Sequence, residues 1–197
     1  MKKVLLLALF LFSFLSLHAE KVVGKYTSFD REKRIEAYVN DKGTLVVFIQ
    51  VDGKYNSEEV MIKVEGENNI KAMASAWREV KEKYIEWIEV AKKNNVSDFR
   101  KEYPISFPKC EIWWLGSKWR SSFSRDFLKP VFIVSSSSKM STSCGGEAKD
   151  WENEYITQKW YLLFSNPNEI QTLIDALDVS KIVSILQEDT KADALFQ

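Results

Sequence analysis

The hydrophobic pattern of this chain changes its period once in the first half, and that change limits the fold more than any other feature. Up to Gly66, apolar and polar residues alternate, as in Ile35–Val39, which is the period of a half-buried strand. Beyond it, apolar residues over Ile70–Ala91 recur at three- and four-residue spacing, which is the period of a helix. The pattern predicts an antiparallel meander followed by one long amphipathic helix, and so an α+β fold.

Four short strands are expected before the helix. They are predicted at Val22–Phe29, Ile35–Val39, Leu45–Val51 and Val60–Val64, with hairpin turns at Asp41–Gly43 and Asp52–Gly53. Because the connections between them are short, we expect each strand to pair with the next.

The second half begins a new run of strands after Pro104 and Pro108. The patterns lie at Cys110–Leu115, Trp119–Phe123, Val131–Val134, Met140–Cys144 (ending at Gly145–Gly146) and Tyr155–Phe164. A helix is predicted next, with Asn166 as N-cap, Pro167 in the first helical position and Glu169 as the acid of a capping box. Shorter C-terminal helical turns follow on the sheet, and residues 190–197 are expected to fray.

Both halves place several strands before a helix. Residues 64–77 read VEGENNIKAMASAW and residues 164–177 read FSNPNEIQTLIDAL, so a turn and an asparagine precede the isoleucine that starts each helix. One interpretation is a ββββα pseudo-repeat with halves at 20–96 and 104–189. The other is chance similarity, because capping chemistry alone produces such junctions. Both interpretations predict a single α+β domain over 20–189.

The first 19 residues have the parts of a secretory signal peptide. Lys2–Lys3 form a basic start, Val4–Leu17 is apolar, and the small residue Ala19 precedes the first acid, Glu20. The apolar part spans about 14 residues, short of the ~20 that cross a bilayer. We expect cleavage after Ala19 and export to the periplasm or the exterior, without a transmembrane segment in the mature chain. The alternative is an uncleaved anchor.

Histidine is absent from the expected mature chain, because the single one, His18, lies in the signal peptide. Ser-His-Asp and Cys-His catalysis need an imidazole, and zinc sites usually need His or several Cys. We therefore expect no metal and no cofactor, and the balance is against an enzyme. Removing Lys2 and Lys3 from the 28 basic residues leaves 26 against 28 acidic ones, so no basic excess favours nucleic acid.

The two cysteines are Cys110 and Cys144. In an oxidising compartment an even number of cysteines normally indicates a disulfide, which would stabilise the domain by about 3–4 kcal/mol. The prediction is a Cys110–Cys144 bridge, and the alternative is two free buried thiols.

Tryptophan and arginine mark the candidate binding residues. Trp113 and Trp114 are neighbours on one strand, so alternation sends one to the core and the other to the opposite face. With Trp113, we select Trp119, Arg120 and Trp151, because aromatic residues and arginine are enriched in binding surfaces. The alternative is that both faces of the strand are covered.

The sequence thus favours a non-catalytic binding domain of the bacterial envelope or exterior, with a protein or glycan partner. One alternative is a carboxylate-dependent hydrolase of an extracellular polymer, with Asp150, Glu152 and Glu154 as its acids. Another is an inhibitor of a secreted enzyme, for which a small disulfide-held body suffices.

Overall fold

The computed structural model describes residues 20–54, 59–115, 119–122, 128–150, 153 and 155–194, and for 115, 119–122 and 189–194 it describes the backbone. The strands are β1 (Lys21–Ser28), β2 (Arg31–Val39), β3 (Leu45–Gly53), β4 (Glu59–Glu65), β5 (Phe99–Glu102), β6 (Glu111–Leu115), β7 (Trp119–Ser122), β8 (Val131–Val134), β9 (Met140–Lys149) and β10 (Thr157–Phe164). The helices are α2 (Glu67–Lys93), α3 (Pro167–Ala176) and α4 (Val179–Ala194).

The strand pairs among the described residues are antiparallel, and the sheet has two wings. Wing A has the order β1-β2-β3-β4-β6-β7, and wing B has the order β5-β8-β9-β10. The wings join where the end of β3 pairs with β10, through Asp52 with Tyr161 and Gly53 with Trp160. The α+β class and the β1–β4 meander are confirmed.

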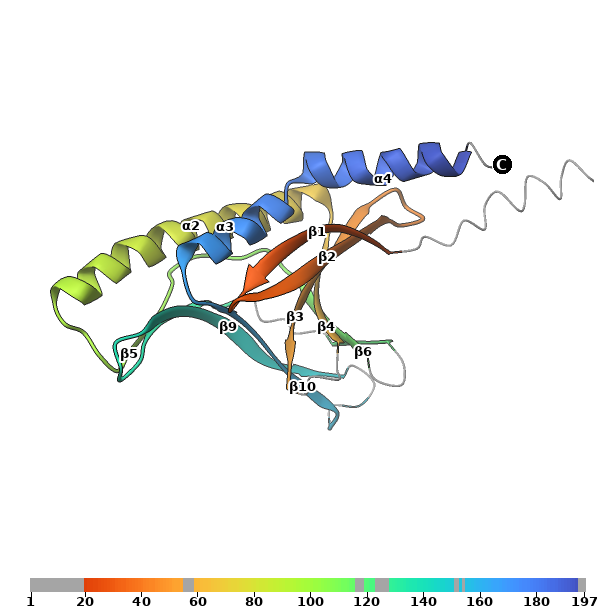
Figure 1. The fold of residues 1–197 in the computed structure, drawn as a ribbon. Coiled ribbons are helices and arrows are strands. Elements are labelled where there is room, and N and C mark those ends of the chain that lie inside the picture. Colours follow the sequence, from red (N-terminus) through yellow and green to blue (C-terminus); the bar gives the residue numbers. More distant parts are fainter. Residues whose placement is uncertain are drawn as a thin grey trace, which may run out of the picture.

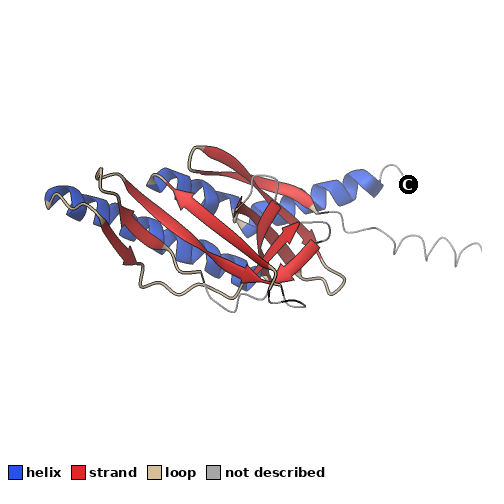
Figure 2. Ribbon diagram, turned by 90° about the horizontal axis from the view of Figure 1, so that it is seen from below, coloured by secondary structure: helices blue, strands red, loops and turns tan. Residues whose placement is uncertain are grey.

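The helices form one layer and the sheet forms the other. In Figure 1, α2, α3 and α4 run along the top of the molecule with the strands below them. Figure 2 shows the sheet from below, with the strands in front of the helices. The helices therefore cover one face of the sheet, and we call the opposite side the helix-free face. Within the described residues, no helix combines the length and apolar character needed to cross a bilayer.

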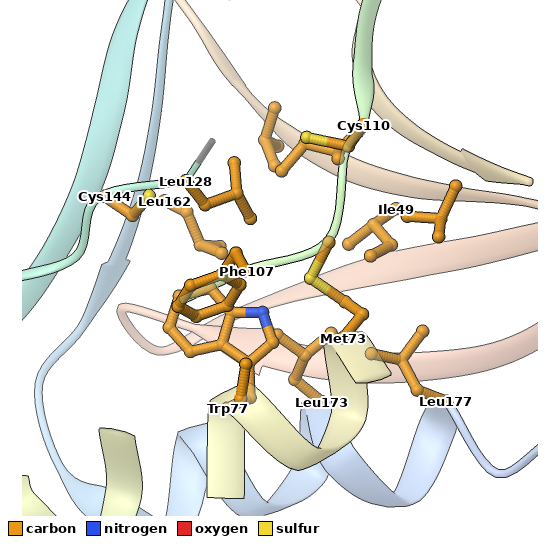
Figure 3. Packing of buried hydrophobic residues seen from close by; sticks show 14 of the residues in the cluster. Ile49, Met73, Trp77, Phe107, Cys110, Leu128, Cys144, Leu162, Leu173 and Leu177 are labelled. Atoms are coloured by element: carbon orange, nitrogen blue, oxygen red, sulfur yellow. The ribbon is translucent and has the colours of Figure 1, made fainter. Parts of the chain in front are cut away.

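The core lies between the two layers and centres on Trp77 of α2, which is fully buried. The Trp77 ring lies 5.1 Å from Phe107, measured between centroids (Figure 3), and 5.3 Å from Phe164, and both contacts are edge to face. One side chain thus joins α2 to the connection before β6 and to β10. Such an aromatic anchor fixes where the helix layer sits on the sheet.

The start of α3 is capped as the sequence predicts, with one difference. The Asn166 side chain accepts hydrogen bonds from the backbone N–H groups of Asn168 and Glu169. The Glu169 carboxylate accepts from the Ser165 N–H at 2.6 Å, one residue before the N-cap, and also from the Asp30 N–H at 2.8 Å. Glu169 therefore ties the first turn of α3 to the β1–β2 turn.

The predicted disulfide is wrong, because both cysteines are free and buried. Cys110 directly precedes β6 in wing A, whereas Cys144 lies in β9 of wing B. Figure 3 shows the two sulfur atoms apart, with Leu128 between them in this view. Burial raises the pKa of each thiol to about 12, which keeps both protonated at neutral pH.

Several elements differ from the sequence-based expectation. The hairpin turn predicted at Asp52–Gly53 is wrong, because these are the last two residues of β3 and pair with β10. β9 does not end at the glycine pair but continues to Lys149, because Gly145 and Gly146 pair with Tyr161 and Trp160 of β10. The exposed strand β5 was not predicted, since its sequence, FRKE, has no alternating pattern. The last helix, expected to be a turn or two, spans 16 residues as α4 and reaches Ala194.

The pseudo-repeat remains a hypothesis. The orders β2-β3-β4-α2 and β8-β9-β10-α3 do match, and Ile70 and Ile170 are both fully buried at the starts of their helices. However, β6 pairs with β4, so strands of the second half complete wing A. The two halves therefore share one sheet.

Replacing Gly145 by alanine tests how closely β9 and β10 approach. A Cβ at Gly145 would lie 2.6 Å from the Trp160 carbonyl oxygen, which is backbone and cannot move aside. We expect Gly145→Ala to lower the free energy of unfolding by about 2 kcal/mol. Gly146→Ala is the matched control, because its Cβ would lie 3.6 Å from the Trp160 indole, an ordinary contact. Equal stability of both variants in denaturant titrations would contradict this geometry.

Candidate functional site

The structure describes only part of the predicted set of binding residues. Trp114 belongs to the main core, whereas Trp113 lies on the helix-free face, as alternation predicts. Trp119 and Arg120 lie on β7, paired with Leu115 and Trp114, and their side chains are outside the described part. Trp151 lies outside the described residues altogether. Trp113 is therefore the starting point for the site.

Trp113 belongs to a second apolar cluster, which we call the outer cluster. It consists of Val46, Phe48 and Met61, with Tyr38 and Trp113 partly buried against them. The Tyr38 and Phe48 rings stack at 6.1 Å, and Trp113 meets Phe48 edge to face at 5.7 Å. Four neighbouring strands of wing A contribute these side chains, so the cluster crosses the helix-free face.

The polar and aromatic groups of Trp113 already have partners. The Lys63 ammonium lies 5.1 Å above the ring, and the indole Nε1–H donates to the Glu111 carboxylate at 2.8 Å. Burial alone would lower the pKa of Lys63, but Glu111 and Glu65 together raise it above the ordinary value. A sugar stacking on Trp113 would have to displace this charged lysine, which disfavours glycan binding at this position.

Two groups of ion pairs lie on the strands that form the outer cluster. Arg34 bonds to Glu36 and Glu59, and Lys63 lies 3.3 Å from both Glu65 and Glu111. These side chains are partly exposed, so each pair contributes little to stability. An aromatic centre with a charged rim is the usual arrangement of a protein–protein contact.

A second group of polar contacts lies where the two wings separate, a position that we call the branch. Side-chain hydrogen bonds connect β1, β2 and β3 there. β2 pairs with β3 only as far as Ile35 with Ile49, and β10 pairs with β3 from Asp52. Between these points, the Gln50 side chain accepts the backbone N–H of Arg34 at 3.1 Å. The Tyr26 hydroxyl donates to the Gln50 carbonyl. Side chains thus replace the missing strand partners.

Asp52 sits at the branch between two cations. Its carboxylate oxygens lie 2.5 Å from Lys33 Nζ and 2.9 Å from Arg31 Nη2. The side chains of Lys33 and Asp52 are only 11% and 10% exposed, whereas that of Arg31 is 49% exposed. Lys33 therefore serves as the buried counter-ion, and Arg31 presents its guanidinium to solvent.

The β1–β2 turn next to Arg31 has an unusual backbone. Phe29 and Asp30 both have positive φ, 50° and 60°, the conformation of a type I′ turn. Asn and Gly normally occupy these positions, and a bulky residue there is strained. The Asp30 N–H is held by Glu169, and the Ser28 hydroxyl donates to the Leu163 carbonyl at 2.8 Å.

Phe29, Arg31, Asp52 and Tyr161 together form what we call the branch patch. Phe29 is 50% and Tyr161 40% exposed. Asp52 connects them, since it pairs with Tyr161 and bonds to Arg31, which directly follows the turn. Sequence reasoning missed this patch, because its members are far apart in the sequence. The pairing of β3 with β10 and the ion pair between Arg31 and Asp52 bring them together. The one local signal was the two-residue link between β1 and β2.

The acids proposed for hydrolysis do not assemble into a described site. Asp150 is buried, and its carboxylate accepts the Asn153 N–H at 3.0 Å. Glu152 and Glu154 lie outside the described residues. A groove of about 800 Å³ between α2 and α3–α4 holds Asp178. The Ser180 hydroxyl lowers the pKa of Asp178, the opposite of what a general acid needs.

Substitution of Phe29 tests whether the turn stores strain. Asn tolerates a positive φ, so we expect Phe29→Asn to leave the free energy of unfolding unchanged or raise it by up to about 1 kcal/mol. Phe29→Val keeps an apolar side chain but is β-branched, and it should lower stability. Thermal and denaturant unfolding measure both variants. An Asn variant less stable than the wild type would show that the Phe29 side chain supports the fold.

Comparisons with protein-family models, with curated proteins and with solved structures find no match to this chain. Its function is therefore argued below from the geometry of its own residues.

Proposed function

We propose that this protein is exported and acts as a non-catalytic binding protein that holds a protein partner on the helix-free face of its sheet. The observation that carries this proposal is the outer cluster, an aromatic and aliphatic group on the face that no described helix covers. Helices already cover the other face, where the main core lies.

The composition of the surface supports a protein partner. Tyr38 and Trp113 lie partly exposed beside the buried Val46, Phe48 and Met61, and Arg34 and Lys63 pair with acidic residues on the same strands. Aromatic residues and arginine are the side chains that contribute most to protein interfaces. A glycan is less well supported, because Lys63 occupies the face of the Trp113 ring.

Export rests on the signal-like residues 1–19, which lie outside the described part. The first described strand begins at Lys21, two residues after the expected cleavage site, so cleavage there would leave every described strand intact. An inhibitor of a secreted enzyme is one form that such a binding protein can take. The same face would then contact the enzyme.

Photo-crosslinking tests which face binds. We would place p-benzoylphenylalanine at Tyr38, where an aromatic ring already stacks on Phe48, and compare it with the same group at Glu82, which is exposed on α2. Irradiation of producing cells should give an adduct of defined mass from position 38 and none from position 82. The Tyr38 adduct should weaken when Trp113 is replaced by Ser. Adducts from position 82 alone, or from neither position, would contradict the proposal.

A further inference from the structure

The branch patch has the chemistry of a site for one particular kind of partner. We propose that it binds an acidic segment of a protein, with a carboxylate on Arg31 and an adjoining apolar side chain against Phe29 and Tyr161. This inference rests on the proposed binding function and names the partner's chemistry. The outer cluster does not include any of these three residues.

The Arg31 guanidinium is held at one edge by Asp52, and its other N–H donors are open to solvent. A guanidinium has five N–H donors in a planar fork. Within the described part of the chain, Asp52 is the partner of this group, and it accepts from Nη2 at 2.9 Å. Because one edge is fixed and the side chain is 49% exposed, the remaining donors face solvent in a defined orientation. A carboxylate is the partner that matches such a fork.

The pairing at Asp52 leaves Arg31 as the cation that a partner can reach. Asp52 is shared by Lys33 and Arg31, so two cations face this one carboxylate. Lys33 is closer, at 2.5 Å, and its side chain is almost buried. The Arg31 side chain is half exposed, so a carboxylate brought by a partner would meet Arg31 rather than Lys33.

The two aromatic residues supply the apolar part of the contact. Phe29 is half exposed in a backbone conformation that Asn or Gly would adopt at lower cost. Strained residues persist where the surroundings hold them, and they are concentrated at functional sites. Here Glu169 and Leu163 hold the two ends of the turn. Tyr161 is exposed opposite Gly145, which has no side chain to cover it.

An acidic protein segment fits these features better than a phosphate ligand. The patch has one exposed cation rather than a cluster, and the expected mature chain has no basic excess. Exposed aromatic side chains beside a single arginine match the composition of protein hot spots. The partner is therefore defined by a glutamate or aspartate next to a large apolar residue.

The test uses the protein purified from the compartment to which cells deliver it. The probe is a fluorescein-labelled eight-residue peptide in which two glutamates alternate with leucine and phenylalanine. The comparison probe has glutamine in place of each glutamate. Fluorescence anisotropy should show about tenfold tighter binding of the glutamate peptide, since a charged hydrogen bond is lost in the other.

Arg31→Gln should abolish this preference. Arg100→Gln is the matched control, because Arg100 is an exposed arginine on β5 with no ion pair within the described residues, and it should keep the preference. Phe29→Asn should weaken binding of both peptides while the protein stays folded. Equal binding of both peptides by the wild type, or an unchanged preference in Arg31→Gln, would overturn the inference.

Two further results separate this inference from the proposed function. If the wild type binds neither peptide while position 38 still crosslinks, the partner chemistry is wrong and the binding face stands. Millimolar inorganic phosphate should not displace the glutamate peptide. If it does so in the wild type but not in Arg31→Gln, Arg31 is a phosphate site, and the inference is again overturned.

Discussion

The structure depends on β3, because this one strand has to pair with β2 over its first part and with β10 at its end. β2 and β10 use the same edge of β3, and one position on that edge can pair with only one of them. The sheet therefore divides at Gln50–Asp52. The groups left without strand partners are satisfied by Gln50 and Tyr26, and Asp52 binds Arg31 and Lys33. The division gives the sheet two wings, and the helices pack across both in one hydrophobic core.

This arrangement also explains where function can lie. The helices cover one face, and on the other face Tyr38 and Trp113 lie partly exposed against the buried Phe48, with ion pairs on the same strands. The branch adds an exposed arginine whose position is fixed by a half-buried ion pair. Both cysteine thiols, whose pKa is raised to about 12 by burial, lie in the core, away from these two surfaces.

Local patterns predicted the elements well, and the pairing between distant segments could not be predicted. The period change at Gly66, the Asn166 cap and the opposite faces of Trp113 and Trp114 are properties of a few neighbouring residues, and all are found. The prediction of a disulfide was wrong because Cys110 and Cys144 belong to different wings, and no local pattern indicates which wing a strand joins. The local sequence at Gly145–Gly146 is typical of a turn, but pairing with β10 keeps both residues in a strand. The branch patch likewise depends on the pairing of β3 with β10.

Hydrogen exchange of Asp52→Asn tests the central claim, that the ion-pair cluster at the branch holds the two wings together. The substitution keeps the shape of the side chain but leaves Lys33 and Arg31 without their anion. The amide of Arg34 and those of 160–161 should exchange at least about tenfold faster, while the amides of α2 around Trp77 keep their protection, because the opening is local. Unchanged exchange at the branch, or an equal loss of protection at the branch and in α2, would contradict this account.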